Sequence, residues 1–153
     1  MWAAPYRWGC TLLLYRVDAA RRAGGPLRDW DDLLRPALRG RLAFVDSPRE
    51  LVAVALRTLG LPPGAGARQL AACGVGEAAL AARVAALAAQ VRVFSSVDHV
   101  RALGAGEVDV VVGWSDDLVP LAARQGGLAL AAPLSGTALY ADAWCVPAGA
   151  AGG

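Results

Sequence analysis

The chain has 153 residues, 56% of them hydrophobic, so it is long enough for one packed core and too short for two full domains. Its basic residues are all arginine, and the formal net charge of +2 is spread along the chain without a basic stripe, which argues against a nucleic-acid partner. The longest apolar runs, such as residues 128–134, are much shorter than the roughly 20 residues that cross a bilayer, so no membrane span is predicted. Residues 1–10 also lack the pattern of a complete secretory signal.

Short apolar runs alternate with helix-length segments along the chain. The predicted strands are residues 10–15, 41–45, 91–94, 108–112 and 128–132. The predicted helices are residues 30–34, 48–59, 77–90, 97–103 and 116–124, several of which begin after a Ser or Asp. This alternation predicts an α/β fold with a mixed, mostly parallel sheet flanked by helices.

The three cysteines have no metal-ligand spacing, and the one histidine, His99, cannot complete a set with them, so neither a metal site nor a cofactor is predicted. Cys10 and Cys145 lie in β-like stretches near the two chain ends and could meet if those stretches pair, although a free thiol is the commoner state. His99 has no nucleophile nearby in the sequence, and we expect it to be packed or solvated rather than catalytic.

Ligands of open α/β sheets bind beyond the carboxyl ends of strands, so residues that follow strands are the first candidates. After residues 41–45 comes Asp46-Ser47-Pro48-Arg49-Glu50. Ser47 fits a helix N-cap, and Glu50 three residues later fits the second half of a capping box, so both have a structural explanation beside a ligand role. Asp46 lies at the end of the strand and has no predicted role in capping the helix.

Two further places combine an aromatic ring with carboxylates. Gly113 and Trp114 follow the apolar strand 108–112, and the indole of Trp114 can either fill the core or stack on a ligand. The next residues are predicted to be a Ser115 cap and two aspartates favourable to the helix dipole. Tyr140 and Asp142 alternate in an extended segment and therefore share a face. An aromatic ring beside a carboxylate is suited to an organic ammonium ion.

Four segments, in this order, resemble the periplasmic spermidine/putrescine-binding proteins of ABC importers, within the type II solute-binding proteins. APYRWGCTLLLYR is similar to the family's Val-Pro-Tyr-x-Trp-Gly-x-Thr strand, and the other three are LRDWDDLLRPALRGRLAFVDSPRELVAVALRTLG, VFSSVDHVRALGAGEVDVVVGWSDD and GTALYADAWCVPAGA. The resemblance implies a non-catalytic protein that binds a polyamine between two lobes. Ser47 stands where polyamine binders often have a second carboxylate, and Tyr140 replaces the usual tryptophan, which leaves the choice between spermidine and putrescine open.

The same resemblance implies the roles of individual residues and the organisation of the chain. Amine groups would be held by Asp46 with Glu50, and by Asp142 beside Tyr140, while Trp114 would stack on the methylene chain. Residues 1–25 and 135–153 would be hinge-crossing segments and residues 26–134 the second lobe, with a first lobe and C-terminal helices absent. The partners would be a polyamine and the ABC permease subunits of an importer, with the binding protein monomeric.

The resemblance implies an extracytoplasmic location, in the periplasm or at the cell surface, with a plastid as the alternative for a photosynthetic eukaryote. Three other interpretations remain open at this point. The chain could bind another small solute, such as a metal chelate or a different organic cation, because one scaffold hosts many functions. It could also be a lobe of an enzyme or ligand-sensing regulator, or a truncated product without independent function.

Overall fold

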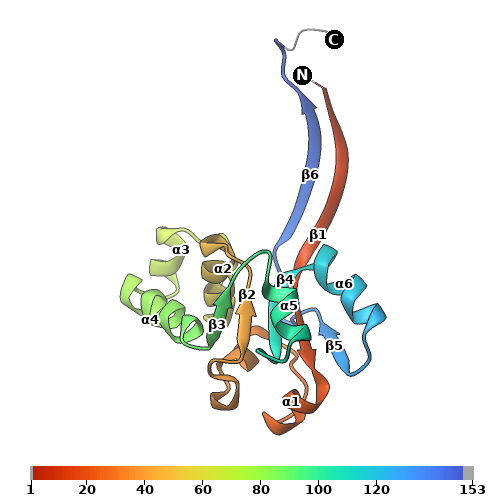
Figure 1. Ribbon diagram of the computed structural model, residues 1–153. Coiled ribbons are helices and arrows are strands. Elements are labelled where there is room, and N and C mark those ends of the chain that lie inside the picture. Colours follow the sequence, from red (N-terminus) through yellow and green to blue (C-terminus); the bar gives the residue numbers. More distant parts are fainter. Residues whose placement is uncertain (1, 150–153) are drawn as a thin grey trace.

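The computed structural model describes residues 2–149, which form a three-layer α/β lobe with a long two-stranded ribbon (Figure 1). Five strands lie side by side in the order β3-β2-β4-β1-β5. Both neighbours of β2, the strands β3 and β4, run parallel to it, whereas β1 is antiparallel to β4 and to β5. Four of these five strands therefore share one direction, as predicted. The strands are β1 (Trp2–Arg16), β2 (Leu42–Phe44), β3 (Val91–Phe94), β4 (Val110–Trp114), β5 (Leu128–Ala131) and β6 (Leu139–Val146).

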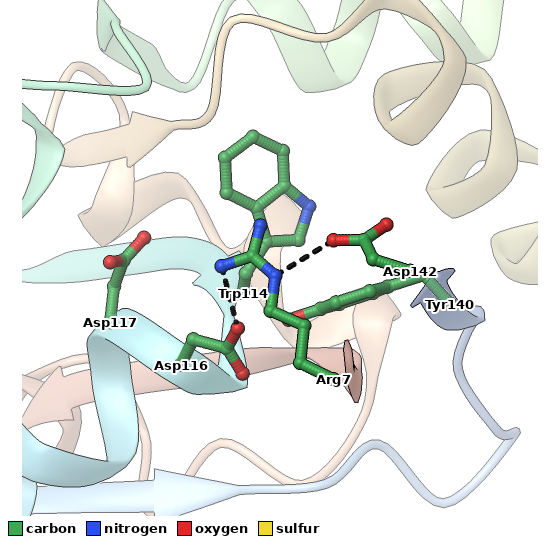
Figure 2. A pocket seen from close by; sticks show the side chains of 6 residues that line it. All are labelled: Arg7, Trp114, Asp116, Asp117, Tyr140 and Asp142. Atoms are coloured by element: carbon green, nitrogen blue, oxygen red, sulfur yellow. Dashed lines mark hydrogen bonds and ion pairs between the residues drawn. The ribbon is translucent and has the colours of Figure 1, made fainter. Parts of the chain in front are cut away.

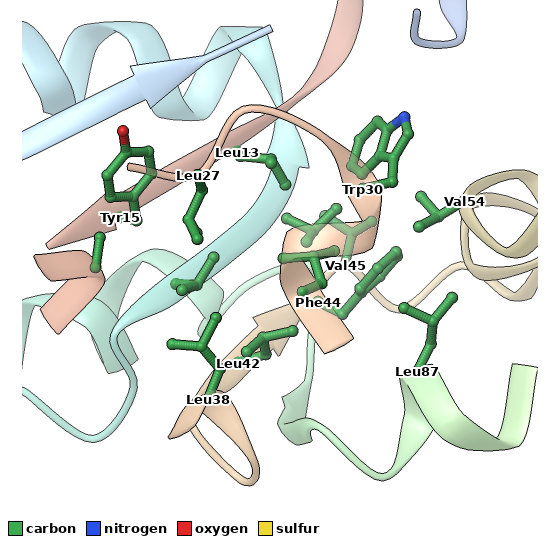
Figure 3. Close-up of a cluster of buried hydrophobic side chains, with 14 of the residues drawn as sticks. Leu13, Tyr15, Leu27, Trp30, Leu38, Leu42, Phe44, Val45, Val54 and Leu87 are labelled. Atoms are coloured by element: carbon green, nitrogen blue, oxygen red, sulfur yellow. The ribbon is translucent and has the colours of Figure 1, made fainter. Parts of the chain in front are cut away.

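The helices cover both faces of the sheet because its strands alternate apolar side chains between two cores. Leu13 of β1 belongs to the buried cluster that includes side chains of α2 and α4 (Figure 3), whereas the adjacent Leu14 belongs to the cluster that includes side chains of α5 and α6. The α-helices are α1 (Val17–Arg22), α2 (Pro48–Thr58), α3 (Ala67–Ala72), α4 (Glu77–Ala88), α5 (His99–Gly104) and α6 (Ser115–Arg124), and two 3-10 helices are η1 (Trp30–Leu34) and η2 (Pro36–Leu38).

Several elements differ from the prediction. The segment 30–34 is a 3-10 helix, α1, η2 and α3 were not predicted, and β1 extends eight residues further toward the N-terminus than expected. Ser47 caps α2 by accepting a hydrogen bond from the Glu50 N–H at 3.4 Å, but the reciprocal half of the predicted capping box is absent. The Glu50 carboxylate instead accepts a hydrogen bond from the hydroxyl of Thr11, at 2.7 Å.

The ribbon consists of the first half of β1 paired antiparallel with β6, and it stands away from the lobe (Figure 1). Its side chains are largely exposed, including Trp2 at 84%, Trp8 at 76% and Trp144 at 69%. An isolated two-stranded ribbon is marginally stable in water, so this one depends on its attachment to the sheet at residues 9–11. The continuous strand β1 supplies that attachment, because its second half lies between β4 and β5.

The pairing of β1 with β6 also decides the question of a disulfide. Cys10 lies opposite Leu139, and Cys145 lies opposite Ala3, seven positions away along β1. At the rise of a β-strand this separates the two cysteines by about 24 Å, far beyond disulfide reach. Both thiols are free. Cys145 lies near the outer end of the ribbon, whereas Cys10 lies at its inner end, where the ribbon joins the sheet.

Candidate functional site

A cavity of about 230 Å³ lies where the ribbon joins the lobe. Its walls come from two parts of the fold: the junction of β4 and α6 on one side, and the paired strands β1 and β6 on the other (Figure 2). The lining side chains are Arg7, Trp114, Asp116, Asp117, Tyr140 and Asp142. Three of the six residues predicted for the ligand, Trp114, Tyr140 and Asp142, are therefore brought together here.

Trp114 ends β4 and is the N-cap residue of α6, so its indole is presented at the carboxyl end of a buried strand. It is half-buried, packing against the core on one side and facing the cavity on the other. Asp116 and Asp117 follow in the first turn of α6, where the helix dipole favours negative charge, and both also line the cavity. The sequence had assigned these two aspartates only to the helix.

The predicted cap at Ser115 is wrong, because its side chain makes no capping hydrogen bond to α6. Its hydroxyl oxygen instead accepts a hydrogen bond from the N–H of Cys10 at 3.2 Å. This contact ties the first turn of α6 to β1. Ser115 therefore connects the two walls of the cavity and does not act as the N-cap of α6.

Tyr140 and Asp142 reach the cavity from the same face of β6, as their alternation indicated (Figure 2). Directly opposite them in the register stand Gly9 and Arg7 of β1. Gly9 is needed because a Cβ at this position would lie 2.5 Å from the Cζ atom of Tyr140. Burial raises the pKa of the Tyr140 hydroxyl, and the nearby Asp116 carboxylate adds to that shift, so the phenol is a neutral group at physiological pH.

Arg7, like Asp116 and Asp117, lines the cavity but was not among the predicted ligand residues. Its Nε lies 2.7 Å from Oδ2 of Asp142, and its Nη1 lies 3.1 Å from Oδ2 of Asp116 (Figure 2). The hydrogen bond to Asp142 raises the pKa of the guanidinium, which is charged at any relevant pH. A signal existed in the sequence, since Arg7 is two residues from Gly9 and thus on the same strand face, but only the register with β6 places it beside Asp142.

The other predicted ligand residues, Asp46, Ser47 and Glu50, do not line this cavity. Asp46 is exposed beyond β2, and its backbone N–H donates to the hydroxyl of Ser96 at 3.0 Å. Glu50 faces a second, much smaller cavity of about 10 Å³ on α2 and is occupied by its hydrogen bond from Thr11. In this lobe the predicted residues thus form two separate groups.

His99 is packed, with 2% of its surface exposed, as one of the two sequence alternatives predicted. It lies behind the cavity wall, with Nε2 at 3.5 Å from Oδ2 of Asp117. Burial lowers the pKa of the imidazole, and the Asp117 carboxylate opposes that shift only in part. The side chain therefore backs the acidic wall as a neutral group at pH 7.

Two further properties concern residues 2–149 alone. Within this range no helix is long and apolar enough to cross a membrane. No cluster of three or more potential His, Cys, Asp or Glu ligands in the described chain is arranged to hold a metal ion. Two of the cavity's three carboxylates, Asp116 and Asp142, contact the Arg7 guanidinium.

Comparison with known proteins places the chain in a family. Residues 2–152 match the family model of the bacterial extracellular solute-binding proteins. The chain is similar to the putrescine-binding periplasmic protein PotF of Escherichia coli, with 26% identity over 97% of this chain and 42% of that protein. These matches agree with the resemblance predicted from the four sequence segments.

Solved structures of low sequence identity share the fold. The spermidine/putrescine ABC transporter substrate-binding protein PotD from Streptococcus pneumoniae matches 92% of this chain, with 18% identity and a TM-score of 0.77. The TpPotD lipoprotein of Treponema pallidum matches 98% of this chain, with 21% identity and a TM-score of 0.77. The chain spans 41% and 46% of these proteins, so it corresponds to less than half of each. The predicted fold, a lobe of a type II solute-binding protein, is confirmed.

Proposed function

Because the chain belongs to the family of bacterial extracellular solute-binding proteins, we propose that it forms part of a non-catalytic protein that binds a polyamine outside the cytoplasm and delivers it to the permease of an ABC importer. The observation that carries this proposal is the cavity itself, where Trp114 and Tyr140 stand beside the carboxylates of Asp116, Asp117 and Asp142. Aromatic faces and carboxylates together favour organic cations and disfavour anions.

Each part of a polyamine has a counterpart in the cavity. The methylene chain suits the indole of Trp114 and the ring of Tyr140, which offer apolar surface in a half-buried setting. The ammonium groups suit the aspartates, whose hydrogen bonds to a charged donor are stronger than those between neutral groups. Putrescine-binding PotF, a relative over nearly the whole chain, supports the choice of a polyamine over other cations.

Asp46 and Glu50 remain predicted ligand residues at the second group of side chains, with Ser47 beside them. Asp46 is exposed and free to approach a ligand held from another part of a larger protein. Glu50 would have to share its carboxylate with the hydroxyl of Thr11, which already donates to Oε2. These residues would extend the site along the edge of the sheet rather than form part of the cavity at Trp114.

The two ends of the chain, residues 1–25 and 135–153, are proposed to connect this lobe to a second one. The exposed aromatic side chains of the ribbon support this proposal, because surfaces of this kind normally lie against other protein. Polyamine would then be enclosed when the two lobes close on it. The whole protein would act as a monomer, in the periplasm or at the cell surface.

Isothermal titration of the longest product of this gene with putrescine and spermidine tests the proposal. We expect Asp142→Ala to weaken polyamine binding by about 10-fold or more, because a hydrogen bond to a charged group contributes about 1.5–3 kcal/mol. Asp18→Ala is the matched control, since this exposed aspartate lies on α1 and pairs only with Arg22 among the described residues. A folded wild-type protein that binds neither amine would refute the ligand assignment.

A further inference from the structure

The cavity already contains a cation that belongs to the protein. The Arg7 guanidinium lies between two carboxylates from different elements, Asp142 on β6 and Asp116 at the start of α6 (Figure 2). The guanidinium thus lines the same cavity as the aromatic rings and carboxylates that would receive a ligand amine. The cation site predicted from the sequence consisted of carboxylates and aromatic rings, without an arginine.

Stability alone does not account for this arrangement. The Arg7 side chain is 53% exposed, and the side chains of Asp116 and Asp142 are 33% and 48% exposed. Ion pairs of such exposure contribute little to the free energy of folding because water and salt screen them. The same guanidinium also repels any ammonium that enters the cavity, so it acts on a charged ligand as well as on the fold.

The charges of the lining residues limit how much positive charge a ligand can bring into the cavity. Three carboxylates, Asp116, Asp117 and Asp142, face one guanidinium, so the formal charge of the cavity lining is three negative and one positive, or −2. A diamine brings two positive charges and balances it. A triamine brings one charge more than this lining balances, so its additional ammonium would either compete with Arg7 for the carboxylates that the guanidinium already holds or have to lie outside the cavity.

We infer that Arg7 is a specificity-determining residue that acts as a built-in cation between Asp116 and Asp142 and makes the cavity prefer a diamine to a triamine. The inference rests on the proposed function, because it concerns which polyamine that site selects. In this view the Arg7 guanidinium pairs with carboxylates that a third ammonium group of the ligand would otherwise use. The remaining carboxylate, Asp117, has a side chain that is 44% exposed and is contacted by the uncharged His99 rather than by an arginine.

A purely structural role for Arg7 makes a different prediction. Arg7 and Asp142 stand opposite each other in the β1–β6 register, so the pair could serve only to hold the ribbon together. In that case replacing Arg7 would change the unfolding temperature and leave the relative affinities for two polyamines unchanged. Ligand preference is therefore the measurement that separates the two roles.

The test is calorimetric titration of the longest gene product with putrescine and with spermidine, for wild type, Arg7→Met and Arg7→Lys. Removing a unit charge about 6 Å from a ligand ammonium changes affinity by about 3-fold at the dielectric constant of water and about 100-fold at an effective value of about 20. We expect Arg7→Met to improve spermidine binding within this range and to shift the spermidine-to-putrescine preference at least about 3-fold toward spermidine. Arg7→Lys keeps the charge and should retain the wild-type preference.

Arg22→Met is the matched control, because it removes the same charge from an exposed position on α1 and should leave both affinities unchanged. Thermal unfolding of all variants shows that they are folded. If wild type binds polyamine and Arg7→Met keeps the same preference, the inference about Arg7 is wrong while the proposed function stands. If neither wild type nor Arg7→Met binds any polyamine, both fail.

Discussion

The lack of room for a side chain at Gly9, beside Tyr140, leads to a prediction that does not depend on any ligand. Gly9 is buried in β1 directly opposite Tyr140 of β6. A Cβ built on Gly9 would lie 2.5 Å from Cζ of Tyr140 and 2.5 Å from Oγ of Ser115, much closer than carbon atoms pack in proteins. Gly9→Ala therefore cannot be accommodated unless both the tyrosine ring and the Ser115 hydroxyl move.

The expected cost follows from the space that the ring occupies. Inserting a methyl group into a filled position costs about 1–3 kcal/mol, because side chains or backbone must shift. When the ring is removed first, by Tyr140→Ala, the main obstacle is gone and the Ser115 hydroxyl can rotate away. We therefore expect Gly9→Ala to cost about 1–3 kcal/mol in the wild-type background and at least about 1 kcal/mol less in the Tyr140→Ala background.

Urea unfolding of the four proteins of this double-mutant cycle, followed by far-ultraviolet circular dichroism, measures the coupling. Gly104→Ala is a control for the substitution itself, since a Cβ at that position would meet no atom within 4 Å apart from its chain neighbours and the backbone of α5. Equal destabilisation by Gly9→Ala in both backgrounds would show that the ring does not lie against Gly9. The geometry of the cavity wall described above would then be refuted.

Three further predictions concern the free energy of unfolding. Because burial lowers the pKa of His99, the unfolded chain binds more protons than the folded chain as the pH falls from 7 to 5.5. The free energy of unfolding should therefore fall by up to about 1.4 kcal/mol per pH unit over this range. In urea titrations, His99→Leu should remove this pH dependence. Glu50→Ala leaves the buried Thr11 hydroxyl without its acceptor and should cost about 1–3 kcal/mol, with Glu50→Gln costing less; equal losses in thermal unfolding would contradict this reasoning. Asp109→Ala breaks two contacts with Arg41, at 2.8 and 3.0 Å, and should also cost about 1–3 kcal/mol, a loss that added salt should reduce only slightly because Asp109 is mostly buried.

Strand and helix positions were largely predictable because burial imposes a period on the sequence. The apolar runs around Leu13, Phe44 and Val111 are strands in the centre of the sheet, and each lies where the pattern placed it. The 3-10 geometry at Trp30 was not predictable, since a five-residue apolar pattern does not distinguish a 3-10 helix from a short α-helix. The helix α3 was missed because none of its residues is buried, which removes the periodic signal.

The candidate site was predictable only in part. Strand ends and two-residue alternation indicated Trp114, Tyr140 and Asp142, because both rules depend on local sequence. Arg7 was missed because its partner is 135 residues away, and only the register of two paired strands brings them together. The same limitation concealed the hydrogen bond from Thr11 to Glu50, which replaced the local capping box that the sequence favoured.

The two halves of β1 differ in what holds them, and the cavity lies at the boundary between these halves. Leu13 and Leu14 are fully buried between helices on both faces of the sheet, whereas the side chains before Gly9 are exposed. The orientation of the ribbon relative to the lobe is therefore fixed mainly at Gly9, Cys10 and Thr11, where β1 contacts α6 through the hydrogen bond to Ser115.

A ligand bound in this cavity, as proposed above, would touch both parts at once. Trp114 and Asp116 belong to the lobe, while Tyr140 and Asp142 belong to the ribbon. A cation that bridges them adds contacts across the boundary that is otherwise held by few groups, so binding stabilises one ribbon orientation over others in proportion to its differential affinity for them. Arg7 makes such a bridge before any ligand arrives, because its guanidinium contacts Asp116 of the lobe and Asp142 of the ribbon. Because these ion pairs are exposed and weak, a ligand that competes for the same carboxylates can replace them at little cost to the fold.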